Sequence, residues 1–265
     1  MSPNEVRRAA VAGMFYPGES RQLANQVDGL LANASSESPS CPKALIVPHA
    51  GYIYSGPVAA SAYGLLNNFA EVIERVVLLG PSHQVPLQGM AVPRSGCFET
   101  PLGRIPLDME GVQRVSGMKG VVLRDDAHLR EHSLEVQLPF LQRCLGEFTL
   151  LPVVVGVCDP ADVAALIDSE WGDAGTLLVI STDLSHYLPY ASARTQDQAT
   201  AERILSLGTD IRGDQACGCY PLNGMLLAAH RRDMKIEPRD LRNSGDTAGT
   251  QDQVVGYGAF ALYEA

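Results

Sequence analysis

Short apolar runs alternate along this chain with longer stretches in which apolar residues recur at helical spacing. Uninterrupted apolar runs bounded by turn residues are typical of buried strands, and apolar residues three or four apart are typical of amphipathic helices. Strands are predicted at residues 44–47, 75–79, 148–155, 176–181 and 254–262, with short β segments within 89–107. Helices are predicted at residues 19–34, 56–67, 126–145, 159–168, 191–207 and 222–230. This alternation predicts an α/β fold with a mainly parallel central sheet and helices on both faces.

Prolines and one aspartate refine the predicted helix ends. Pro57 suits the first turn of a helix that begins near Gly56, because that turn needs no backbone donor. Asp159 followed by proline is a good helix N-cap. Pro139 lies inside the predicted 126–145 helix and implies a kink or a late start there.

The length of 265 residues allows one large domain or two small ones. The only stretch that resembles a linker, Ala34 to Pro42, follows too little sequence to separate an independent domain. We therefore expect a single α/β domain over residues 1–265.

Charge and hydrophobicity exclude several classes of partner. The net charge is −10 and no Lys/Arg run occurs, which argues against nucleic acid or an anionic membrane as a partner. The longest apolar run, Leu150 to Val157, is too short to span a membrane, and the N-terminus lacks the apolar core of a signal peptide. Six cysteines in a chain of this length do not indicate a disulfide framework. We expect a soluble cytosolic protein.

Histidines follow three of the predicted strands. His49 comes just after the first strand, His83 ends a Gly-Pro-Ser-His turn after the second, and His186 closes the turn after the 176–181 strand. Ligands of open α/β sheets collect beyond the carboxyl ends of the strands, and parallel strands place those ends on one edge. The three imidazoles are therefore expected to converge, although a lone histidine is more often a structural residue.

Further polar groups are candidates for the same edge. His132 and Glu135 open the predicted 126–145 helix region, and Asp183 lies in the turn before His186. Histidine with a carboxylate or a thiolate is the ligand set of a transition-metal site, and an unligated histidine there would serve as an acid or base. His128 and His230 are interpreted as surface or packing residues.

The cysteine pair Cys217-Gly218-Cys219 has two interpretations. Either thiol could be a small buried filler, or a thiolate in this Gly/Pro-bounded loop could bind a soft metal. A CxC spacing without a second pair does not define a structural zinc site.

Several motifs together resemble the Memo family, also called the AmmeMemoRadiSam system protein B family. They occur in order along nearly the whole chain: AGMFYPG (12–18), PHAGYIYSG (48–56), LLGPSHQVPL (78–87), FETPLG (98–103), EHSLEVQLPFL (131–141), LPVVVG (151–156), STDLSHY (181–187) and CGCYPLNGMLL (217–227). The resemblance implies a fold similar to class III extradiol dioxygenases of the LigB type, with a metal site in a cleft.

The resemblance also implies roles for individual residues. The metal ligands would be His49, His83 and Cys217, while Asp183 and His186 would be the catalytic residues, with His186 at the position of the dioxygenase acid/base. His132 and Glu135 would line the pocket nearby. Family members are described as binding iron or copper with redox activity. The ring-cleaving enzymes use two histidines and a carboxylate, so a thiolate at the third position leaves catechol cleavage unsupported.

Three functions remain open at this point. The first is a metal-dependent redox protein, with Fe(II) favoured and copper or zinc as alternatives. The second is a non-catalytic module that binds a small molecule or peptide in the same place, and the third is a zinc hydrolase. The substrate, the oligomeric state and the question of whether Cys219 shares the role of Cys217 are not determined.

Overall fold

The computed structural model describes residues 5–34, 37–38 and 40–264 of the chain. Residues 35, 36 and 39 of the predicted linker, and the extreme ends of the predicted 1–265 domain, lie outside the described residues.

Four parallel strands form the centre of the main sheet. They lie in the order β2 (Ala44–Val47), β9 (Thr176–Ser181), β3 (Arg75–Pro81) and β8 (Thr149–Val155). These strands are buried almost throughout, which is why their sequences are continuous apolar runs rather than alternating ones. The four predicted strands are confirmed, and their carboxyl ends share one edge of the sheet.

Antiparallel pairings extend the sheet on both sides. On one side β12 (Val254–Tyr263) runs antiparallel to β2 and pairs with β10 (His186–Leu188) and β11 (Lys235–Asn243). On the other side β4 (Met90–Val92) runs antiparallel to β8 and pairs with β7 (Val121–Leu123). The fold class is confirmed: antiparallel pairings join β12 to β2 and β4 to β8, whereas the outer pair of β4 and β7 is again parallel.

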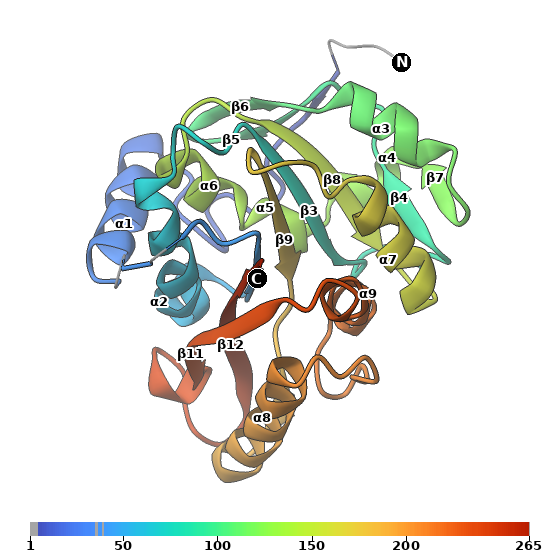
Figure 1. The fold of residues 1–265 in the computed structure, drawn as a ribbon. Coiled ribbons are helices and arrows are strands. Elements are labelled where there is room, and N and C mark those ends of the chain that lie inside the picture. The colour runs from blue at the N-terminus through green and yellow to red at the C-terminus, as the bar shows by residue number, and fades with distance from the viewer. Residues whose placement is uncertain (1–4, 35–36, 39, 265) are drawn as a thin grey trace.

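Helices cover both faces of this sheet (Figure 1). One face packs against α1 (Ser20–Ala32), α2 (Tyr52–Tyr63) and α6 (Leu138–Cys144), and the other against α3 (Met109–Ser116), α7 (Pro160–Ser169) and α9 (Cys219–His230). Alternate residues of β2 point to the two faces, so that Leu45 and Ile46 belong to separate apolar cores. The remaining long helix, α8 (Tyr190–Leu205), packs on β11 and β12.

The predicted 126–145 helix is broken into three short helices. These are α4 (Asp125–Leu129), α5 (His132–Glu135) and α6. Glu131 begins α5 as an N-cap, since its carboxylate accepts a hydrogen bond from the backbone N–H of Ser133 at 2.9 Å. Pro139 lies in the first turn of α6, where its missing donor costs nothing. Because α5 is separate from α4 and α6, its orientation is not fixed by theirs.

Two other predictions concerned helix starts. Asp159 caps α7 as expected, with its side chain accepting from the backbone N–H of Ala161. The start near Gly56 was wrong, because α2 begins at Tyr52 and Pro57 lies inside it. The proline removes the donor for the carbonyl of Ile53, and Ile53 is exposed, so water can replace that donor. No helix of the described residues is both long and apolar enough to cross a membrane.

A small second sheet joins the N-terminal segment to the middle of the chain. It consists of β1 (Val6–Arg7), β5 (Cys97–Thr100) and β6 (Gly103–Pro106). β1 pairs with β5 in parallel, and this pairing brings Arg7 to the side of the 125–135 region. The N-terminal residues are thereby carried toward the carboxyl edge of the main sheet.

Candidate metal centre

Three imidazoles meet at the carboxyl edge of the parallel strands. His49 lies two residues beyond β2, His83 two residues beyond β3, and His132 opens α5. The ring centroids are 5.2 Å apart for His49 and His83, 5.5 Å for His49 and His132, and 4.7 Å for His83 and His132. One nitrogen from each ring lies within 4.8 Å of the others. We call these three residues the histidine cluster.

The hydrogen bonds of His49 determine its tautomer. Its Nδ1 lies 2.9 Å from the hydroxyl of Ser181, and that hydroxyl donates its own proton to the backbone carbonyl of Ser133 at 2.6 Å. The hydroxyl oxygen must therefore accept from Nδ1–H, which leaves Nε2 of His49 with a free lone pair. Burial and the neighbouring imidazoles hold the pKa of His49 well below its usual range. The ring is neutral and ready to act as a ligand through Nε2.

His83 is oriented by a buried carboxylate. Glu131 accepts from Nδ1 of His83 at 2.9 Å and from its backbone N–H at 2.6 Å. Although burial alone would raise the pKa of Glu131, these hydrogen bonds hold it at about 2. A carboxylate that fixes one nitrogen of a histidine and directs the other outward is typical of metal-ligating histidines.

His132 is held between two rings. It stacks on His83 with an interplanar angle of 21°, and Phe15 of the N-terminal segment packs on it with centroids 4.8 Å apart. Burial lowers the pKa of His132 to about 4, so this ring is also neutral near pH 7. The sequence placed His132 near the site, and the structure makes it a member of the cluster.

Cys217 contacts the cluster through His49. Its Sγ lies 3.2 Å from Nε2 of His49 and accepts from the backbone N–H of Asp183 at 3.4 Å. Burial and the nearby Asp183 raise the pKa of Cys217 to about 12, so the residue is a thiol unless a cation is bound beside it. Cys219, two residues later, is the first residue of α9 and instead packs in the apolar core. The two cysteines therefore have different surroundings.

Asp183 lies behind His49. Its carboxylate accepts from the backbone N–H of His49 at 2.7 Å and lies 4.0 Å from Nε2 of the same residue. Burial raises the pKa of Asp183 to about 7, against the effect of that hydrogen bond. The carboxyl group can therefore hold or release a proton near neutral pH.

His186 is half-buried at the start of β10. Its Nδ1 is 2.8 Å from the carbonyl of Leu184, so Nδ1 carries the proton and Nε2 is free. Burial, and to a smaller extent the neighbouring His83, lower the pKa of His186. The next residue, Tyr187, has a φ of 57° and is 68 % exposed. A bulky residue in this conformation is strained, a condition that gathers at functional sites.

Glu135 is turned away from the imidazoles toward the N-terminal segment. Its carboxylate forms an ion pair with Arg7 and accepts from the hydroxyl of Tyr16 at 2.5 Å. It also accepts from the backbone N–H groups of Ala10 and Val11 at 2.8 and 3.0 Å. We call Arg7, Tyr16 and Glu135 the N-terminal anchor. The anchor fixes the segment that carries Phe15 against His132.

The two histidines left outside the site on sequence grounds are placed as expected. His128 is buried and its Nε2 lies 3.1 Å from the carbonyl of Ala91, which makes it a packing residue. His230 is exposed at the end of α9.

Two contributions to the site were not recognised from the sequence. Ser181, which sets the tautomer of His49, is the last residue of β9 and pairs in register with Val47. A hydroxyl at that strand end was the available signal. Phe15 gave no signal, because its contact with His132 spans over a hundred residues and depends on the N-terminal anchor.

The fold and the site define an α/β protein with an imidazole-rich site at the carboxyl edge of parallel strands. The sequence matches the Memo-like protein family over residues 7–261, and the chain belongs to this family. It is 38% identical over 264 residues to a MEMO1 family protein of Aquifex aeolicus, covering 95% of this chain and 97% of that one. It is 34% identical over 277 residues to a MEMO1 family protein of Metallosphaera sedula, with the same coverage.

Among solved structures, the chain is similar to the uncharacterized protein JW3007 from Escherichia coli K12. The TM-score is 0.50 at 13% identity, over 82% of this chain and 99% of that one. This likeness shows a shared α/β fold.

Proposed function

We propose that this protein is a metal-dependent redox protein that holds one iron or copper ion at His49, His83 and Cys217. The observation that carries the proposal is the direction of the His49 ring. Its Nδ1–H is committed to Ser181, and its free Nε2 faces the sulfur of Cys217 at 3.2 Å. Imidazole and thiolate together suit iron, copper and zinc. Fe(II) is the first choice because the histidines resemble those of the non-haem iron sites.

A bound ion would supply the electron transfer, and the chain's own residues would do the rest. Ser181 and Glu131 orient the two imidazoles through their Nδ1 atoms. His186 is half-buried with an unprotonated Nε2, which can accept a proton from a small molecule or peptide bound beside it. Asp183, with a pKa of about 7, can hold that proton or return it.

The ligand assignment is tested by anaerobic titration of the metal-free protein with Fe(II), Cu(I) and Zn(II), followed by calorimetry. We expect His49→Ala and Cys217→Ser to weaken affinity by more than about a hundredfold, beyond the effect of removing a residue that only orients a ligand. Cys219→Ser is the matched control, because this second thiol is buried in the core, and it should leave affinity unchanged. His132→Ala should have a smaller effect than Cys217→Ser.

The opposite order of effects would favour a second function, a zinc hydrolase. The histidine cluster itself supports this alternative, since three histidines with one open position bind catalytic zinc. If His132→Ala abolished binding and Cys217→Ser did not, three imidazoles would be the ligands. Ester hydrolysis by the zinc form without oxygen consumption by the iron form would then replace the redox proposal. Failure of every metal to bind or to raise the melting temperature would overturn both proposals.

A further inference from the structure

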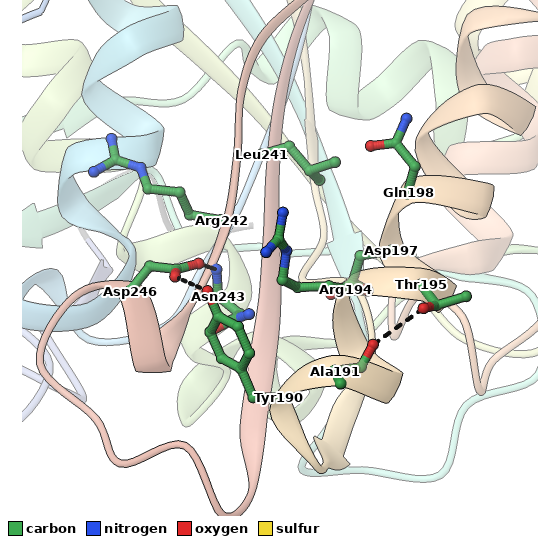
Figure 2. A pocket seen from close by; sticks show the side chains of 10 residues that line it. All are labelled: Tyr190, Ala191, Arg194, Thr195, Asp197, Gln198, Leu241, Arg242, Asn243 and Asp246. Carbon is green, nitrogen blue, oxygen red and sulfur yellow. Dashed lines mark hydrogen bonds between the residues drawn. The ribbon is translucent and has the colours of Figure 1, made fainter.

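A cavity lies apart from the histidine cluster, between α8 and the end of β11 with the 3₁₀ turn η2 (Ser244–Asp246) (Figure 2). Its volume is about 640 Å³, which is within the range of small-molecule sites. No member of the histidine cluster lines it, and neither do Cys217, Asp183 or His186.

Arg194 supplies a cation to this cavity (Figure 2). Within the described residues its guanidinium lies within 4.0 Å of no carboxylate and is 5.8 Å from the centre of the Tyr190 ring. By contrast, Arg203 on the same helix pairs with Asp210 at 2.7 Å. The guanidinium of Arg194 is therefore available to an anion, for which its planar donors are well suited.

Asn243 supplies an uncommitted donor. The residue is 1% exposed, and its Oδ1 accepts from the backbone N–H of Gly245 at 2.9 Å. Its Nδ2 donates to none of the described residues. A ligand oxygen in the cavity would satisfy this donor.

The carboxylates that line the cavity are hydrogen-bonded within the protein. Asp246 is engaged by the hydroxyl of Tyr190 at 2.5 Å and by the backbone N–H of Asn243 at 3.0 Å. Asp197 is buried, accepts from the backbone N–H of Ser185 at 2.9 Å, and has its pKa raised by burial. Donors of the protein therefore already occupy oxygens of both carboxylates.

The side chains beside Arg194 and Asn243 can contact the apolar part of a small organic ligand. Tyr190 presents an aromatic ring whose position is fixed by the hydrogen bond to Asp246, and Leu241 is a half-buried apolar neighbour. A flat or aliphatic group could stack on this ring while an attached anion meets Arg194.

We propose that this cavity binds a small organic oxyanion, a carboxylate or a phosphate monoester, through Arg194 and the Nδ2 of Asn243, with its apolar body against Tyr190. This site is separate from the metal centre. The cavity is nevertheless linked to the neighbourhood of the metal centre. Asp197, which lines the cavity, accepts from the backbone N–H of Ser185, the residue before His186.

The test uses the full chain, labelled with nitrogen-15, and follows amide shifts by NMR. The probes are benzoate, phenyl phosphate, acetate and inorganic phosphate, with uncharged benzamide as the isosteric control. We expect saturable shifts at residues 190–198, 241–246 and 185 with benzoate or phenyl phosphate, weaker binding of acetate and phosphate, and no saturation with benzamide. The benzoate and phenyl phosphate arms distinguish a carboxylate site from a phosphate site.

Substitutions locate the interaction. Arg194→Gln should raise the Kd of the better aromatic probe at least about tenfold, because it removes a charge-assisted hydrogen bond. Arg203→Gln, on the same helix outside the cavity, should leave the Kd unchanged. His49→Ala should also leave it unchanged, which separates this site from the metal proposal.

Equal affinity in the wild type and Arg194→Gln would overturn the proposal. So would the absence of saturable shifts with all four anions, or shifts confined to the histidine cluster.

Discussion

Glu131 and Glu135 lie one helical turn apart, on either end of α5, and both are almost fully buried. Glu131 accepts from His83 and directs that ring toward the cluster. Glu135 accepts from Arg7, Tyr16 and two backbone N–H groups, none of which belongs to the cluster. The same residue type at the same depth thus serves a site on one side of α5 and an anchor on the other.

This comparison shows that burial of a carboxylate next to a histidine in the sequence is not sufficient to identify a residue of the metal centre. What distinguishes the two glutamates is the partner. Glu131 accepts from Nδ1 of His83, and this leaves Nε2 of the same ring free to bind a ligand. The donors that Glu135 accepts from have no such second atom to present to a metal. The two sides should therefore respond differently to substitution, in stability on the anchor side and in metal affinity on the cluster side.

The largest expected effect is on the anchor side. Glu135→Ala leaves the guanidinium of Arg7 buried without its carboxylate, and should lower the free energy of unfolding by roughly 3–5 kcal/mol. Urea unfolding measures the change. The matched control is Glu99→Ala, which removes an exposed partner of Arg104 and should cost at most about 1 kcal/mol. Equal losses in both variants would mean that the anchor does not stabilise the fold.

The next effect concerns pH and His128, whose carbonyl accepts from Arg7. Burial lowers the pKa of His128 to about 4 from an ordinary value of 6.5. Between these values the unfolded chain binds a proton that the folded chain does not, so stability present above pH 6.5 is lost as the pH falls toward 4. The loss should reach roughly 3 kcal/mol. Urea unfolding at several pH values, compared with His128→Gln, isolates it, and identical slopes for the two proteins would refute it.

On the cluster side, Glu131→Gln should act mainly on metal affinity. The amide keeps the volume but cannot hold His83 by a charged acceptor, and loss of such a partner costs about 10–100-fold in affinity. Calorimetric titration with Fe(II) or zinc measures this. The free energy of unfolding should fall less in Glu131→Gln than in Glu135→Ala. Unchanged metal affinity together with a large loss of stability would erase the contrast between the two glutamates.

The smallest effect links the two sides. Phe15→Leu keeps an apolar side chain on the anchored segment but removes the ring that packs on His132. We expect metal affinity to fall less than about tenfold, since His132 is loosened rather than lost. Unfolding in urea should change by no more than about 1.5 kcal/mol. A larger affinity loss than that of Glu131→Gln would make Phe15 the main support of the cluster.

The central strands and the meeting of His49 with His83 follow from the sequence alone. Buried parallel strands need continuous apolar runs, and such runs were visible at 44–47 and 75–79. Parallel strands end on one edge, so histidines placed just after them had to lie close together. The ordered motifs likewise indicated the Memo-like family, which the match over residues 7–261 confirms.

The use of the remaining groups depends on how the folded chain brings distant segments together. The strand β11 is half-buried and its sequence is largely polar. No apolar run therefore indicates a strand at these residues. The break at Glu131 rotates α5 so that His132 faces His83 while Glu135 faces Arg7, and the spacing of those residues does not specify that rotation. Side-chain direction depends on contacts between segments far apart in the sequence, 128 residues in the case of Arg7 and Glu135, and these exist only once the chain is folded.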